Sequence, residues 1–211
     1  MIRHAAAERA ALCDTLLEVG ADAPTLCGGW TSGDLLAHLL VREGRPDATA
    51  GIFVPALAGR AEKAMRHLRE RHDHVTLVEK LRQGPPKWHP THVARIDEQV
   101  NLVEMFIHHE DVLRASLGAP RRSLSTQMVS SLGDRLESMA PLLFRRTKGA
   151  SIELVTAKRR TRIGTEGPVV EIHGRPGEIL LFGFGRQSVA EIELIGQPEA
   201  VEVVRTTTYG L

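Results

Sequence analysis

Long apolar runs are absent from this 211-residue sequence: no stretch approaches the roughly eighteen consecutive apolar residues that a membrane-spanning helix needs. The start of the chain, in which Glu8 and Arg9 interrupt an alanine-rich run, also lacks the apolar core and cleavage site of a secretory signal peptide. We therefore expect a cytoplasmic protein without a membrane partner.

An excess of charge of either sign is also lacking, because 27 lysines and arginines face 26 aspartates and glutamates, for a formal net charge of +1. A protein whose main task is to bind nucleic acid or an anionic membrane usually carries a strongly basic surface. The balance of charge therefore favours a small molecule as the partner.

Cysteine is scarce, since the chain has only Cys13 and Cys27. Two cysteines are too few for a disulfide framework, and a reducing compartment would keep both as thiols. Cys13 is expected in the core. Cys27 precedes a Gly28–Gly29 turn close to His38, and two roles stay open for it: a metal ligand or nucleophile, or a small buried hydrophobic residue.

Against this background, the most informative feature is the pair Glu104 and His108, which lies four residues apart in a mostly apolar segment. On a helix this spacing puts a carboxylate and an imidazole on one face, about one turn apart. Two interpretations follow from the spacing alone: a hydrogen-bonded surface pair or two ligands of one metal ion. A third ligand would favour the metal.

His38 is the best candidate for a third ligand. Thr31 and Asp34 have the spacing of a capping box, and Trp30 before them can pack on Leu35, so a helix should begin near Thr31. The neighbours of His38 on that helix are nearly all aliphatic, which predicts a buried imidazole that needs a partner. That partner is either a backbone carbonyl in the core or a shared metal ion.

The arrangement of the chain predicts an α+β protein with two domains. Six helices are expected in the first two-thirds, over about 5–19, 31–42, 58–71, 76–83, 96–116 and 125–146, and they form a bundle. Short aliphatic runs then predict strands at 152–155, 169–172 and 192–195, with helices starting at Pro176 and Pro198. We place the boundary between 148 and 149, with the bundle in 1–148 and a small α+β domain in 149–211.

Two further motifs have plain structural explanations. The basic run 158–162 falls where two strands would be joined, which favours a solvated hairpin tip over a nucleic-acid site. The segment 183–186 contains two glycines, but it matches neither a Walker pattern nor a dinucleotide fingerprint. It is expected to end a helix.

Taken together, three separated segments resemble the DinB-like metalloproteins of the actinobacterial type that are grouped with mycothiol-dependent maleylpyruvate isomerase. The segments are 29–39, 104–111 and 177–186, so the resemblance spans nearly the whole chain. It implies an amino-terminal DinB-like four-helix bundle in which His38, Glu104 and His108 hold a divalent metal ion. It also implies a carboxy-terminal domain like that of sterol carrier proteins. Many DinB relatives have three histidines, and the carboxylate here is as in the thiol-dependent isomerase.

Two histidines and one carboxylate leave at least one position on the ion open, which is typical of catalytic zinc, although the same ligands can hold Fe(II). Zinc is favoured because nothing else in the sequence indicates oxygen chemistry. Asn101 and Asp111 share the ligand face of the helix and are candidates for orienting a ligand, as well as for ordinary polar contacts. His109 points roughly 100° away from His108 on the helix, so it is expected outside the metal shell, with pairing to another helix left open.

Three functions are consistent with these features. The first is a thiol-dependent transferase or isomerase, for which the resemblance implies mycothiol as co-substrate, and in which a metal-bound thiolate attacks a small electrophile. The second is metal-assisted hydrolysis. The third is non-enzymatic: a metal-stabilised protein that binds an apolar ligand or a partner. The sequence does not identify the substrate or the oligomeric state.

Overall fold

The computed structural model describes residues 3–44, 58–116 and 121–210, which form two compact units, Met1–Arg122 and Ser123–Leu211. The sequence predicts a boundary between 148 and 149, some 26 residues later than this division. The difference is helix α7 (Thr126–Leu143), which packs against helix α8 (Pro176–Gly183) of the second unit. Only the tertiary contacts of α7 reveal this assignment, since its amphipathic pattern fits either unit.

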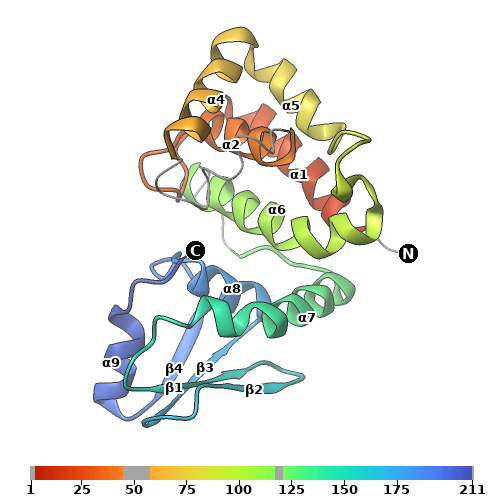
Figure 1. The fold of residues 1–211 in the computed structure, drawn as a ribbon. Helices are drawn as coiled ribbons and strands as arrows, with labels where there is room; N and C mark the ends of the chain where they lie inside the picture. The colour runs from red at the N-terminus through yellow and green to blue at the C-terminus, as the bar shows by residue number, and fades with distance from the viewer. Residues whose placement is uncertain (1–2, 45–57, 117–120, 211) are drawn as a thin grey trace. The chain divides into compact units, whose positions relative to one another are not determined.

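The described part of the first unit is helical (Figure 1). Its elements are α1 (His4–Val19), α2 (Ser32–Gly44), α4 (Ala58–Arg71), α5 (His74–Arg82), the short 3₁₀-helix η2 (Pro90–His92) and α6 (Ala94–Ser116). Helix α1 packs along α6 and α5, and α2 packs on α4 and α5. These five α-helices lie close to the predicted ranges, whereas the resemblance implies a bundle of four.

The core of the first unit is built from the apolar faces of these helices. A continuous cluster of buried side chains joins α1, α2, α5 and α6, and it includes Leu12, Leu16, Leu35, Leu36, Leu39, Leu81 and Met105. Cys13 belongs to this cluster and is fully buried, as predicted. Burial of such side chains contributes about 1.5–3 kcal/mol each, which is sufficient to hold polar groups in fixed positions between the helices.

The second unit is a four-stranded sheet with three helices. Strands β1 (Ser151–Val155), β2 (Arg160–Ile163), β3 (Val169–Gly174) and β4 (Ile192–Gly196) lie in the order β2-β1-β3-β4, and only β1 and β3 run parallel. Helix α8 contacts β3 and β4, and so does α9 (Pro198–Thr206). The α+β class predicted from the sequence is therefore confirmed.

One face of this sheet is covered and the other carries charge. Ile152 and Ile172 are at most 1% exposed, whereas Glu153 and Glu171 on the alternate positions are partly exposed. The same unit contains a cluster of three aromatic rings, those of Phe144, Phe182 and Tyr209, whose centroids lie 5.3–6.5 Å apart. The alternation of buried and partly exposed side chains along β1 and β3 is expected for strands of a sheet that is covered on one face.

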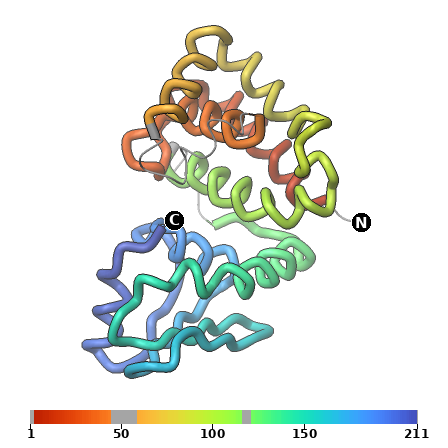
Figure 2. Tube along the Cα trace, viewed as in Figure 1, coloured from red at the N-terminus to blue at the C-terminus, as the bar shows by residue number. Residues whose placement is uncertain are grey.

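The basic run 158–162 lies at a hairpin, and its path can be followed in Figure 2. Residues 156–159 form the turn, and Arg160 begins β2, a strand that the sequence did not predict. Arg159 pairs with Glu137 at 2.7 Å, and Arg160 pairs with Glu153 at 2.8 Å. A hairpin turn does lie here, but it joins β1 to the unpredicted β2, and residues 160–162 belong to that strand and not to the tip; the predicted strands β1 and β3 run parallel. Acidic neighbours compensate two of the positive charges of the run.

The segment 183–186 ends α8, as predicted, with Gly185 at a φ of 85°. A side chain there would also bring its Cβ within 2.8 Å of the Tyr209 carbonyl oxygen.

Among the residues that the structure describes, we find no helix that combines the length and the apolar character needed to cross a membrane.

Candidate metal centre

His38, Glu104 and His108 converge at one point inside the first unit. One imidazole nitrogen from each histidine and one carboxylate oxygen of Glu104 all lie within 4.8 Å of one another. His38 comes from the middle of α2, whereas Glu104 and His108 lie one turn apart on α6. The structure therefore brings together the three residues that the sequence analysis selected.

The two distances from Glu104 to the histidines resemble the edges of a metal-binding tetrahedron. Oε1 of Glu104 lies 3.4 Å from Nε2 of His38 and 3.3 Å from Nε2 of His108. Ligands bound to zinc at 2.0–2.1 Å in tetrahedral geometry are separated by about 3.3–3.4 Å. In the metal-free protein the same contacts serve as long hydrogen bonds, beyond the roughly 2.7–3.2 Å that is usual for N–H···O. The donor set and its spacing fit a divalent ion with at least one further position for a reactant.

The start of α2 fixes the position of His38. The backbone nitrogen of Thr31 donates to Asp34 Oδ2 at 3.0 Å, and that of Asp34 donates to Thr31 Oγ1 at 3.2 Å. This reciprocal capping box, predicted from the sequence, sets where the helix begins and hence which face carries His38. The indole of Trp30 packs against the imidazole of His38, with ring centroids 5.1 Å apart.

Asp111 orients His108. Its carboxylate is fully buried, and Oδ2 lies 2.9 Å from Nδ1 of His108. A hydrogen bond from Nδ1–H to a carboxylate leaves Nε2 directed at Glu104 and His38, the arrangement common around histidine ligands of metals. Of the two roles left open for Asp111, this contact supports that of orienting a ligand.

The protonation of the cluster follows from its burial and its hydrogen bonds. Burial lowers the pKa of His38 below its ordinary value, although the hydrogen bond to Glu104 opposes this effect. Burial alone would raise the pKa of Glu104, but hydrogen bonds with His108 and His38 hold it well below the ordinary range. Burial alone would lower the pKa of His108, but hydrogen bonds to Asp111, Cys27 and Glu104 raise it well above the ordinary value. Glu104 and His108 thus form an ion pair beside a neutral His38.

Arg42 contacts the candidate site and was not predicted from the sequence. It lies one turn after His38 on α2, and its Nε atom is 3.3 Å from Oε1 of Glu104. Its Nη1 atom donates to Asn101 Oδ1 at 2.5 Å. The signal was available, since Arg42 follows His38 by four residues and therefore shares its helix face.

Of the two roles left open for Asn101, orienting a ligand or ordinary polar contacts, the structure shows the second. Its side-chain amide donates to Asp97 at 2.8 Å and to Glu43 at 3.2 Å, and its oxygen accepts from Arg42. Arg9 joins the same carboxylates, at 3.0 Å from Asp97 and 2.5 Å from Glu43. Asn101 therefore positions Arg42, rather than a histidine or Glu104 itself.

The charges of this buried network fit a divalent cation. It contains the guanidinium groups of two arginines and four carboxyl groups, so with every carboxyl group ionised its formal charge is −1 while His108 is protonated and −2 once His108 is neutral, as a metal ligand must be. The arginines are Arg9 and Arg42, and the carboxyl groups belong to Glu43, Asp97, Glu104 and Asp111. Buried charge that is not compensated is costly, and a dication between His38, Glu104 and His108 would balance it.

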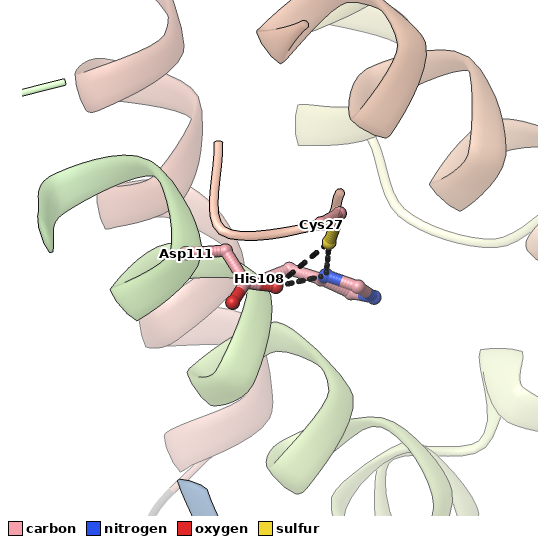
Figure 3. Close-up of side chains that lie close together, drawn as sticks. All are labelled: Cys27, His108 and Asp111. Atoms are coloured by element: carbon pink, nitrogen blue, oxygen red, sulfur yellow. Dashed lines mark hydrogen bonds and ion pairs between the residues drawn. The ribbon is translucent and has the colours of Figure 1, made fainter. Parts of the chain in front are cut away.

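Cys27 lies on the far side of His108 from Glu104. Its Sγ atom is 3.0 Å from Asp111 Oδ2 and 3.8 Å from His108 Nδ1 (Figure 3). The cysteine is partly exposed, in contrast to the fully buried Cys13. Its expected proximity to the candidate site is therefore correct.

His109 lies outside the cluster, as predicted from its helical position. Its Nδ1 atom is 2.8 Å from Glu8 Oε1, and its Nε2 atom is 2.9 Å from Thr15 Oγ1, so the ring is held against α1. Arg122 also donates to Glu8, at 2.6 Å. These contacts give His109 a structural role in joining α1 to α6.

Comparison with solved structures supports the overall fold. The chain is similar to the crystal structure of the mycothiol-dependent maleylpyruvate isomerase, with a TM-score of 0.50, 16% sequence identity and 90% of each chain covered. A histidine-to-alanine mutant of that enzyme gives a TM-score of 0.49 at the same identity and coverage. At this identity the likeness concerns the fold alone. No protein-family model matches the sequence, and no curated protein matches it.

Proposed function

We propose that this protein binds one divalent metal ion, with zinc favoured, through His38, Glu104 and His108, and uses it in a thiol-dependent transferase or isomerase reaction. The observation that carries the proposal is the convergence of three donor atoms from two helices, at spacings close to those of a tetrahedral ion. The fold shared with a mycothiol-dependent isomerase supports mycothiol as the thiol and a distant relationship to that enzyme.

The chemistry that such an ion supplies is Lewis acidity, which favours the thiolate form of a bound thiol at neutral pH. The sulfur forms a bond to an electrophilic carbon of a substrate double bond, the π electrons of that bond move to the adjacent carbon, and the proton of the thiol goes to solvent. In a transferase the adjacent carbon then takes up a proton from solvent, and the new C–S bond remains in the product. In an isomerase the bond breaks again after rotation about the former double bond, which regenerates the thiol.

The residues of this chain position the reactants. His38, Glu104 and His108 hold the ion, and Asp111 keeps the Nδ1 proton of His108 so that Nε2 is available. Arg42 adds a fixed positive charge next to Glu104, which favours a substrate that carries a carboxylate or develops negative charge. Held together in this way, the reactants avoid most of the entropy cost of a bimolecular encounter.

Maleylpyruvate with mycothiol is the first assay to perform, because the structural neighbour acts with that pair. We expect turnover that requires both the thiol and a divalent ion and that is lost in His38→Ala. The matched control is His67→Ala, which removes an exposed histidine of α4. Turnover that persists in His38→Ala would contradict the proposal, and ester or amide hydrolysis without added thiol would favour the hydrolase alternative.

A further inference from the structure

His108 presents its two ring nitrogens to two different groups of donors. Nε2 faces Glu104, whereas Nδ1 faces Asp111 and Cys27 on the other side of the ring. Figure 3 shows this second group, in which the sulfur, a carboxylate oxygen and a ring nitrogen point toward one another. Cysteine sulfur, imidazole nitrogen and carboxylate oxygen form a second donor set, in which Cys27 has no part in the proposed function.

The loop before α2 is built to keep the sulfur in place. The backbone nitrogen of Leu26 donates to the carbonyl oxygen of Asp111 at 3.2 Å, which joins the loop to α6 one residue before Cys27. Thr25 closes the loop further, since its hydroxyl donates to Trp30 O at 2.9 Å and accepts from the Cys27 nitrogen at 3.2 Å. Cys27 thus has a fixed position beside the Asp111 side chain.

We propose that Cys27, His108 and Asp111 form a second cation site, selective for thiophilic divalent ions such as cadmium and zinc. The donor atoms are 2.9, 3.0 and 3.8 Å apart, and a tetrahedral ion bound to sulfur at about 2.3 Å and to nitrogen and oxygen at about 2.0–2.1 Å needs separations of about 3.3–3.6 Å. Shifts of a few tenths of an ångström meet this requirement. The partial exposure of Cys27 gives an ion access to the sulfur.

The chemistry of the donors determines which ions bind. A thiolate prefers soft and borderline cations, whereas the His38, Glu104 and His108 group is suited to harder ions as well. Binding at Cys27 exchanges the cation for the thiol proton and for the proton on Nδ1 of His108, and both protons go to solvent. Nε2 then carries the remaining ring proton and donates it to Glu104.

The shared histidine makes the two sites alternatives. A neutral imidazole has one lone pair for a metal, so His108 can serve the first group through Nε2 or the second through Nδ1, but not both. A thiophilic ion at Cys27 therefore withdraws His108 from the proposed catalytic ion. This consequence rests on the proposed function, whereas the existence of the thiolate site does not.

The experiment is a titration of the metal-free full-length protein with Cd²⁺, followed by the ultraviolet charge-transfer absorption of the cadmium–thiolate bond. We expect a band that saturates at one equivalent per chain in the parent protein and in Cys13→Ser, and that is lost in Cys27→Ser. Cys13→Ser is the matched control because it removes the other, buried cysteine. Circular dichroism of each variant verifies that it is folded.

His38→Ala distinguishes this site from the proposed catalytic centre. The band should persist in that variant, because His38 is not a donor to the second group, even if binding at the first centre is lost. The site is overturned if the folded parent protein shows no band, or if the band survives Cys27→Ser or disappears in Cys13→Ser. Failure of thiol-dependent turnover would overturn the proposed function and leave the cadmium result unchanged.

Discussion

Asp111 and Glu104 contact the two different ring nitrogens of His108: Oδ2 of Asp111 lies 2.9 Å from Nδ1, and Oε1 of Glu104 lies 3.3 Å from Nε2. Because Asp111 is fully buried, this hydrogen bond does not compete with water. The tautomer and orientation of a candidate ligand are thus determined by a residue three positions further along the same helix.

Asp111→Asn tests this relationship. The substitution keeps the size of the side chain but removes the negative charge that stabilises the Nδ1 proton. We expect the affinity for a divalent ion at His38, Glu104 and His108 to fall about tenfold to a hundredfold, as for other partners of metal-bound histidines. Calorimetric titration with Zn²⁺ in the Cys27→Ser background measures this change, and an affinity equal to that of Cys27→Ser alone would exclude the orienting role.

Arg42→Met tests whether a fixed positive charge weakens the candidate centre. The guanidinium lies beside Glu104 and repels a dication, so its removal should tighten divalent-ion binding by roughly tenfold. Arg71→Met, at an exposed position of α4, is the matched control and should leave the affinity unchanged. Weaker binding in Arg42→Met would show instead that the arginine organises the ligands.

The same Arg42→Met substitution should destabilise the metal-free protein. Asn101 is fully buried and accepts a hydrogen bond from Arg42, so the variant leaves its oxygen without that donor. We expect a loss of about 1–3 kcal/mol in the free energy of unfolding. Denaturant unfolding followed by tryptophan fluorescence reports on the first unit, because Trp30 and Trp88 both lie there. An unchanged midpoint would contradict the expected loss.

Glu8 should make the free energy of unfolding of the first unit decrease at acidic pH. Burial would raise its pKa, but hydrogen bonds from His109 and Arg122 lower it below the ordinary value of 4.5. A carboxylate with a lowered pKa in the folded state stabilises the protein above its unfolded pKa, and this contribution is lost as the pH falls through the folded pKa. Unfolding free energies should therefore drop below about pH 4.5.

Glu8→Gln identifies the group responsible. This variant cannot ionise, so its stability should fall less steeply than that of the parent protein over the same acid range. Glu18→Gln, on an exposed position of the same helix, should retain the parent's slope. Equal slopes in all three proteins would show that Glu8 does not carry the acid dependence.

Much of the fold could be predicted because the starts of helices are determined by residues that are neighbours in the chain. The capping box of Thr31 and Asp34 determines the start of α2, and the prolines at 176 and 198 mark the starts of two later helices. Strand β2 was missed because its sequence, Arg-Thr-Arg-Ile, has no apolar run. Its partner β1 and the acidic side chains around it hold it in place.

The candidate site could be predicted only in part. Glu104 and His108 follow from helical spacing, but the choice of His38 among ten histidines depended on a resemblance as well as on its apolar surroundings. That Asn101 contacts Arg42 instead of a ligand depends on where α2 places Arg42 and Glu43, which are 59 and 58 residues from Asn101 in the chain. Such networks form through tertiary packing and leave no local pattern.

The central claim is that His38, Glu104 and His108 hold one divalent ion, and zinc binding in the Cys27→Ser background tests it most directly, since sulfur cannot then contribute. Metal-free protein should bind one Zn²⁺ per chain, and the additional substitutions His38→Ala and Glu104→Gln should each abolish or greatly weaken that binding. His67→Ala in the same background should bind like its parent. Undiminished stoichiometric binding in the His38→Ala and Glu104→Gln proteins would contradict the account.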